Sequence, residues 1–180
     1  GGRGESTLLT TEERLFAAEM PQRNIRLLAE RLRKVGPIPE IVRDTPPVYE
    51  IGDVHEFWVG NVDTMEQHRI QAVLRYATPH LYMWVEEGVK YSKQALIRSA
   101  KEFEEKTYPR TREFFGSEWL PGVDSDPHLH ILHSTGDRMG SGVAGYYSSA
   151  DEYSSLANPY ANEREMFYVS LSGMQPGTDF

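Results

Sequence analysis

Two histidines and two aspartates lie close together in the sequence, at spacings that suit metal binding. His128 and His130 are two residues apart in a segment whose pattern predicts a strand, so both side chains leave the same face and could share a zinc ion. No third ligand has a fixed relation to them. Strand histidines on a polar face, or histidines that are partly buried and hydrogen-bonded, are the commoner alternative, and the sequence favours that alternative.

Asp124 and Asp126 precede this predicted strand. Alternating aspartates in a loop supply the hard oxygen ligands that calcium prefers, so they are weak calcium candidates. An EF-hand loop needs more ligands and a glycine at its sixth position, and neither is present here. The favoured alternative is a turn in which the aspartates accept hydrogen bonds from nearby backbone N–H groups.

Other catalytic patterns are absent from the sequence. Ser141 lies between two glycines but lacks the G-x-S-x-G pattern and the strand-to-helix turn of a serine nucleophile. The chain has no cysteine and no HExxH motif, and no glycine-rich phosphate loop precedes a helix. By motif alone we expect an α+β domain without a self-sufficient active site.

Length and charge narrow the class further. With 180 residues, 39% hydrophobic residues and a net charge of −8, the chain is long enough for a hydrophobic core and too acidic for a phosphate-binding surface, so no nucleic-acid partner is expected. The charge is uneven: residues 1–43 carry eight basic and six acidic side chains, and the remainder carries the acidic excess. No apolar run approaches the length of a membrane span.

The first 47 residues are predicted to form a helical arm and a linker. Thr11-Glu12-Glu13 is a helix start signal, and Pro21 suits the first turn of a second helix in which Ile25, Leu28 and Leu32 share one face. Residues 36–47 are rich in proline and predict an extended linker. We therefore expect an arm or pro-segment over residues 1–47 and a body over residues 48–180.

The pattern of the body predicts a sheet and one long helix. Strands are expected at residues 54–59, 69–76, 80–86, 128–133, 142–147 and 165–171, the last apolar on both faces as in an interior strand. In residues 69–76, Ile70, Ala72, Leu74 and Tyr76 are expected to share one face. Ser92 predicts the N-cap of a helix over residues 92–107, which Pro109 is expected to end or kink.

Several strings in this body resemble bacterial secreted zinc metallopeptidases related to the immune inhibitor A and hyicolysin families, over about residues 12–180. The two most specific strings are the last two of the following set: residues 52–59 (GDVHEFWV), 74–85 (LRYATPHLYMWV), 115–119 (FGSEW), 124–127 (DSDP), 145–153 (GYYSSADEY) and 158–168 (NPYANEREMFY).

The resemblance implies a zinc-dependent endopeptidase whose metal site is not in this sequence. In such enzymes the helix that carries HExxH follows the Glu165-Met166-Phe167-Tyr168 strand after a short loop, and its histidines bind zinc while its glutamate activates water. The sequence ends at Phe180, where that helix is expected to begin. The resemblance therefore implies an N-terminal fragment that is inactive alone, with zinc in the complete enzyme and calcium as a second candidate ion.

The resemblance also implies a thermolysin-like scaffold: a twisted mixed or antiparallel sheet, one long helix, and an edge strand beside the substrate cleft. That edge strand corresponds to Val143, Ala144, Gly145, Tyr146 and Tyr147, which would bind an extended peptide through backbone hydrogen bonds. Ordinary packing of the two tyrosines at a sheet edge is the alternative.

Two further functions remain open at this stage. The chain is either a non-catalytic peptide- or protein-binding or inhibitory module with a peptidase-like lobe, or one part of an enzyme completed by a separate C-terminal chain. A secreted, extracellular location is implied by the resemblance.

Overall fold

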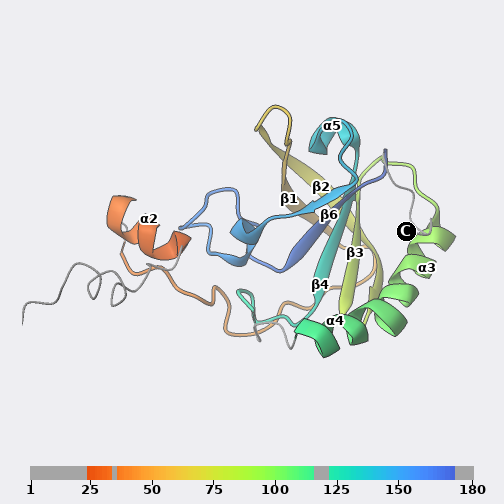
Figure 1. Cartoon of the computed structure of the whole chain (residues 1–180), viewed down its shortest axis with the longest axis horizontal. Coiled ribbons are helices and arrows are strands. Elements are labelled where there is room, and N and C mark those ends of the chain that lie inside the picture. The colour runs from red at the N-terminus through yellow and green to blue at the C-terminus, as the bar shows by residue number, and fades with distance from the viewer. Residues whose placement is uncertain (1–23, 34–35, 116–121, 173–180) are drawn as a thin grey trace, which may run out of the picture.

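The computed structural model describes residues 24–33, 36–115 and 122–172, and it shows an α+β fold built on one six-stranded mixed sheet (Figure 1). The strand order is β1-β2-β3-β4-β6-β5. The strands are β1 (Val54–Gly60), β2 (Gln67–Thr78), β3 (Leu81–Glu86), β4 (Leu129–Ser134), β5 (Gly145–Tyr147) and β6 (Met166–Ser170). The helices are α2 (Ile25–Arg33), α3 (Lys93–Glu102), α4 (Tyr108–Phe115) and α5 (Gly136–Met139), with a π-helical turn η1 (Phe103–Thr107) and a 3₁₀ turn η2 (Ser149–Glu152).

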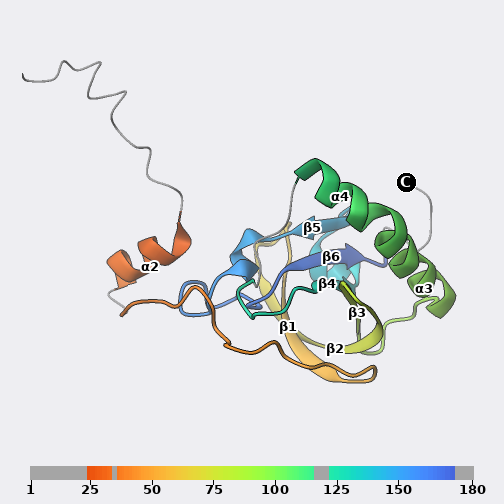
Figure 2. The same ribbon diagram turned by 90° about the horizontal axis from the view of Figure 1, so that it is seen from below.

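The sheet combines an antiparallel and a parallel part. β1, β2 and β3 form an antiparallel meander, whereas β3, β4 and β6 run parallel and β5 is antiparallel to β6. Parallel neighbours need a long crossover connection, and the helical segment α3–η1–α4 lies in the connection between β3 and β4. Figure 2 shows this helical segment along one face of a strongly curled sheet.

Each face of the sheet has its own hydrophobic core. On the helix side, Leu81, Met83 and Val85 of β3 pack with Leu96 and Ala100 of α3. The opposite face is more aromatic, and its buried members include Phe57, Trp84, Met166 and Tyr168. The alternation of β3 side chains between the two cores explains why that strand is apolar along its whole length.

The predicted strands are confirmed, with corrections at two of them. β5 begins at Gly145, so Val143 and Ala144 precede the strand. In β2 a register shift lies between Leu74 and Tyr76, because a β-bulge adds one residue there. Tyr76 therefore packs against the helix-side core, and the expectation that it shares a face with Leu74 is wrong.

The long helix is confirmed at its start and extends past its predicted end. The Ser92 side chain accepts a hydrogen bond from the Ala95 backbone N–H, as an N-cap does. Pro109, however, lies inside a helical segment that continues to Phe115. The preceding turn is π-helical, with the Tyr108 N–H donating to the Phe103 carbonyl, and this wider turn accommodates a residue that has no N–H to donate.

Helix α2 contacts the body through a small apolar cluster. Ala29 and Ile38 pack with Ala157, and Ile25 and Tyr153 border them. Of the three residues predicted to share one helix face, Ile25 borders this cluster, whereas Leu28 and Leu32 are 48% and 78% exposed. The predicted start of the first helix, Thr11 to Glu13, and Pro21 lie outside the described residues.

The described part of the chain contains no helix with the length and apolar character that a membrane span requires.

Candidate functional site

Strand β5 presents an open backbone edge. Its partner on one side is β6, with Tyr146 opposite Tyr168, and it is last in the strand order. The Ser170 N–H donates to the Ala144 carbonyl at 2.8 Å, so Tyr146 and Tyr168 form the hydrogen-bonded pair of this ladder. The polar backbone groups of Gly145 and Tyr147 therefore point away from β6.

The opposite edge of the sheet, strand β1, is covered by side chains. The Asn162 carboxamide accepts from the Trp58 N–H at 2.8 Å and donates to the Trp58 carbonyl at 2.9 Å, much as a neighbouring strand would. Two residues further along β1, the Gly60 N–H donates to the Tyr146 hydroxyl at 3.0 Å. Between Trp58 and Gly60 the edge of β1 is therefore covered, whereas no described side chain bonds to the outward backbone groups of Gly145 and Tyr147, so β5 can accept another strand.

A buried network holds these covering groups in place. The Asp151 carboxylate accepts from the Asn162 backbone N–H at 2.8 Å and from the Tyr168 hydroxyl at 2.7 Å, and the Asn162 side chain donates to the same hydroxyl at 2.7 Å. Burial raises the pKa of Asp151, and it also raises the pKa of Tyr168 well above its usual value. Tyr146 stacks on Tyr168 with ring centroids 4.3 Å apart. The network joins both ends of the sheet at one point.

A hollow of about 400 Å³ opens between the two edges. Backbone and side chains of β5 and η2 form one wall, and the β1–β2 turn forms the other. Its lining includes Trp58, Gly60, Asn61, Val62, Met65, Gln67, Tyr146, Asn158 and Tyr160. Sequence reasoning identified only one wall of this hollow, the β5 segment. The residues of the β1–β2 wall lie about eighty positions earlier in the chain, so no local pattern links the two walls.

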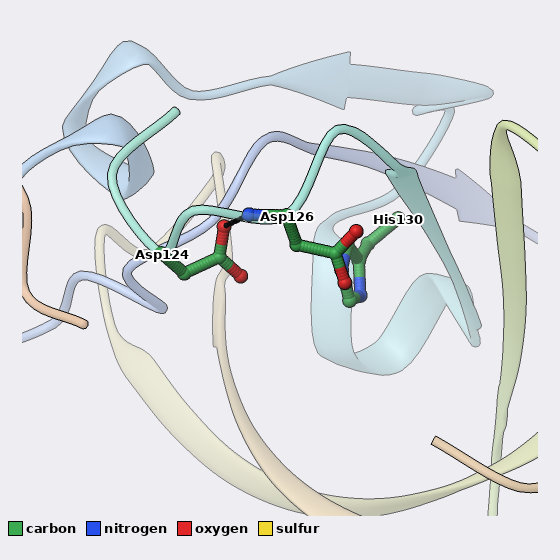
Figure 3. A group of neighbouring side chains, drawn as sticks. All are labelled: Asp124, Asp126 and His130. Atoms are coloured by element: carbon green, nitrogen blue, oxygen red, sulfur yellow. Dashed lines mark hydrogen bonds between the residues drawn. The ribbon is translucent and has the colours of Figure 1, made fainter. Parts of the chain in front are cut away.

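The predicted metal candidates lie at the start of β4, away from β5. One ligand atom each from Asp124, Asp126 and His130 lie within 4.8 Å of one another, and all three residues are buried (Figure 3). His128 does not join them: its ring stacks on Tyr82 and its Nδ1 contacts the Asp126 carboxylate. The structure thus brings His130 to the aspartate pair, and His128 does not share a candidate metal position with it.

The environment of His130 does not fit a zinc ligand. The Trp84 indole N–H, which can only donate, lies 3.0 Å from His130 Nδ1, so Nδ1 accepts and Nε2 carries the proton. Coordination through Nε2 would move that proton to Nδ1, where it would face the Trp84 N–H. Burial lowers the pKa of His130 well below its usual value, and the nearby Arg164 guanidinium lowers this pKa further and also repels a cation.

The turn uses one oxygen of each aspartate, and Asp126 Oδ2 is buried without a hydrogen-bond partner among the described residues. Asp124 Oδ1 accepts from the Asp126 backbone N–H, and Asp126 Oδ1 accepts from the His128 backbone N–H. These bonds are those of the turn that the sequence favoured. Calcium takes six to eight oxygen ligands, whereas the third member of this cluster is an imidazole. Calcium binding at Asp124 and Asp126 therefore stays a prediction, and the donor set does not favour it.

A buried carboxyl lies at the start of β6. The Glu165 carboxylate packs against Gly122 so closely that a Cβ at Gly122 would lie 2.6 Å from Glu165 Oε1, and Gly122 also has a φ of +77°. Burial raises the pKa of Glu165 to about 7, and the carboxylates of Asp124 and Glu152 raise it as well. Sequence reasoning placed Glu165 only in a strand. Its burial depends on the loop at Gly122, more than forty residues earlier in the chain.

Comparison with known proteins supports a relationship to metallopeptidases. No protein-family model matches the chain. Over 124 residues the chain is 31% identical to the neutral metalloprotease ShpI of Staphylococcus hyicus. This alignment covers 67% of the chain but only 27% of that protein, so the chain matches about a quarter of its relative's length.

Proposed function

We propose that this chain is the N-terminal, sheet-bearing part of a zinc-dependent endopeptidase, in which β5 binds the substrate. The similarity to a neutral metalloprotease supports the peptidase class, and the fold supports the lobe: a curled mixed sheet with one long helix on one face, as in thermolysin-like enzymes. The open β5 edge is the single observation that carries the binding role. An extended peptide would hydrogen-bond to the outward backbone groups of Gly145 and Tyr147.

Zinc belongs to the remainder of the proposed enzyme. Among the described residues the Asp124, Asp126 and His130 cluster is the group with metal-ligand geometry, and the Trp84 hydrogen bond makes it unfit for zinc. The match to only part of a longer relative agrees with a metal site elsewhere. The complementary partner is then the C-terminal part of the catalytic domain, on the same chain or a separate one, and the location is extracellular.

A paired expression experiment tests this function. The 180-residue chain and a polypeptide that continues through the downstream reading frame are purified, and zinc content and hydrolysis of an unstructured protein substrate are measured for both. The shorter chain should hold no stoichiometric zinc and show no hydrolysis, and the longer one should hold about one zinc per chain and be active. An HExxH motif soon after Phe180 would support the proposal.

The second candidate is a non-catalytic binding module. The β5 edge favours it equally, because β-strand addition needs no metal. A stop codon directly after Phe180, or an extended polypeptide that binds peptides without zinc and without hydrolysis, would replace the peptidase with this module.

A further inference from the structure

The hollow beside β5 has exposed apolar side chains at its border. Met65 is 80% exposed, and Val62 and Tyr160 are each 47% exposed, so large apolar surface faces solvent here. Trp58 forms an edge-to-face pair with Tyr160, with ring centroids 5.0 Å apart. The other lining side chains are mostly amides, hydroxyls and tyrosines, together with the buried Asp151 carboxyl, and among the described lining residues none is basic. A volume of about 400 Å³ lies within the usual range for ligand pockets.

A strand added to β5 would place one side chain in this hollow. Residues directly opposite each other on neighbouring strands extend to the same face of the sheet. Tyr146 lies on the face that carries the hollow, since its hydroxyl reaches the Gly60 N–H. The peptide residue opposite Tyr146 therefore points into the hollow.

The neighbouring peptide residues point to the other face. There, Tyr147 and Phe167 pair with ring centroids 5.4 Å apart and remain 45% and 44% exposed. A bound strand would thus contact two surfaces, the open hollow on one face and the Tyr147–Phe167 pair on the other.

We propose that the hollow is a specificity pocket that accepts one large apolar side chain, aliphatic or aromatic, of an extended peptide paired with β5. This proposal rests on the proposed binding role of β5 and adds the class of side chain that the site selects. Burial of that side chain against Trp58, Met65 and Tyr160 would supply the selectivity, while the backbone hydrogen bonds of β5 would supply affinity that does not depend on sequence.

Titration with guest peptides tests the pocket on the 180-residue chain. A short host peptide of Thr and Ser residues, blocked at both ends, carries Phe, Leu, Ser or Asp at its central position. Calorimetry gives the affinities, and hydrogen exchange at the Gly145 and Tyr147 amides reports pairing with β5. The Phe and Leu peptides should bind about tenfold or more tightly than the Ser peptide, because each buries a large apolar side chain. All bound peptides should slow exchange at both amides.

A matched pair of variants locates the selectivity. Met65 has a φ of 61°, a conformation that asparagine tolerates better than most residues, so Met65→Asn should fold normally. It should reduce the preference for Phe over Ser to about threefold or less while the Ser peptide binds unchanged. Val48→Asn is the control, since Val48 is 88% exposed and does not line the hollow. It should leave the preference unchanged.

The possible outcomes distinguish a failure of the specificity-pocket proposal from a failure of the proposed binding role of the β5 edge. Equal affinity for all four guests, with slowed exchange at β5, would overturn the pocket and leave the binding role of β5 intact. Failure of every peptide to bind would overturn both. Self-association of the chain that slows the same two amides without peptide would assign the edge to a second copy and would also overturn the proposal.

Discussion

At the scale of single residues, hydrogen-bond chemistry decides what the clustered histidines and aspartates can do. The Trp84 indole N–H sets the tautomer of His130, and the turn around Asp126 uses one oxygen of each aspartate. A cluster with the residue types of a metal site is therefore a neutral imidazole beside turn-forming carboxylates. Asp124, Asp126 and His130 approach within 4.8 Å, and Asp126 Oδ2 and His130 Nε2 have no hydrogen-bond partner among the described residues, so metal binding at this cluster is a question for experiment.

Metal addition should accordingly leave the stability of the chain unchanged. An ion present at a hundred times its dissociation constant would add about 2.7 kcal/mol and raise the melting temperature by several degrees. With zinc or calcium we expect a shift within about 1 °C of the value in a chelator, measured by scanning calorimetry. A saturable rise that Asp126→Asn abolishes would contradict this expectation.

Glu165 should give the stability a distinctive pH dependence. Its folded-state pKa is raised to about 7 from 4.5, so the folded chain binds this proton more tightly than the unfolded chain. The contribution of Glu165 is therefore most favourable below pH 4.5 and is lost as the pH rises from 4.5 to 7. Glu165→Gln should remove this loss and be more stable than the wild type by about 1–2 kcal/mol at pH 8, allowing for partial solvent screening.

Urea unfolding at pH 4.5 and pH 8 measures this effect. The control is Glu105→Gln, an exposed glutamate on η1, which should show no comparable gain at pH 8. A Glu165→Gln variant whose stability relative to the wild type is the same at both pH values would refute the role of the buried carboxyl.

At the scale of elements, the pairing of the short strand β5 with β6 depends on a close backbone approach. Strand β5 has three residues, and its attachment to β6 relies on the Tyr146–Tyr168 pair and the flanking backbone bonds. Gly145 is required for this approach, because a Cβ there would lie 2.6 Å from the Tyr168 carbonyl oxygen. The glycine thus holds the proposed peptide-binding edge in the sheet.

Replacement of Gly145 by alanine should detach β5. The clash with a backbone atom cannot be relieved by a rotamer change, so we expect a loss of about 1–3 kcal/mol in stability and at least about tenfold weaker binding of the Phe guest peptide. Gly36→Ala is the control, since a Cβ at Gly36 meets no atom within 4 Å. Denaturant unfolding and calorimetry check both effects, and an unchanged affinity in Gly145→Ala would show that β5 does not carry the binding.

At the scale of the whole molecule, the curled sheet brings its two ends together without pairing them. β1 and β5 are at opposite ends of the strand order, yet the Asn162 and Tyr146 side chains link the region of β5 to the backbone of β1. These side chains bond to the backbone groups of Trp58 and Gly60 in β1 and leave the outward groups of Gly145 and Tyr147 in β5 open. The hollow is the space that this incomplete closure leaves.

Asn162→Ala should destabilise the whole sheet. It removes the partner of the Trp58 N–H, the closer of the two donors to the Trp58 carbonyl, and one partner of the Tyr168 hydroxyl. Leaving such groups unsatisfied should cost about 2–4 kcal/mol in the free energy of unfolding, measured in urea. Asn158→Ala, which removes a single exposed bond to the Tyr160 N–H, should cost about 1 kcal/mol or less. Equal losses in the two variants would contradict the linking role of Asn162.

Local sequence patterns predicted most of the helices and strands, and the errors in these predictions have local structural causes. Alternation of apolar residues identified β2, and Ser92 identified the start of α3, because both signals depend on near neighbours in the sequence. The bulge between Leu74 and Tyr76 and the π-helical turn before Pro109 leave no comparable signal. The bulge turns Tyr76 to the other face from Leu74, and the π-helical turn lets the helix, expected to end or kink at Pro109, continue to Phe115.

The sequence by itself determined the α+β class, the strands and long helix, the absence of common catalytic motifs, and a resemblance to metallopeptidases that the match to ShpI supports in part. Only the tertiary structure decided which sheet edge is open, which metal candidates meet, and where the hollow lies. The physical reason is range: periodicity and capping act over a few residues, whereas Asn162 covers Trp58, and Met65 faces Tyr160, across about a hundred residues of chain. Those contacts follow from the curl of the sheet, which no short stretch of the sequence encodes.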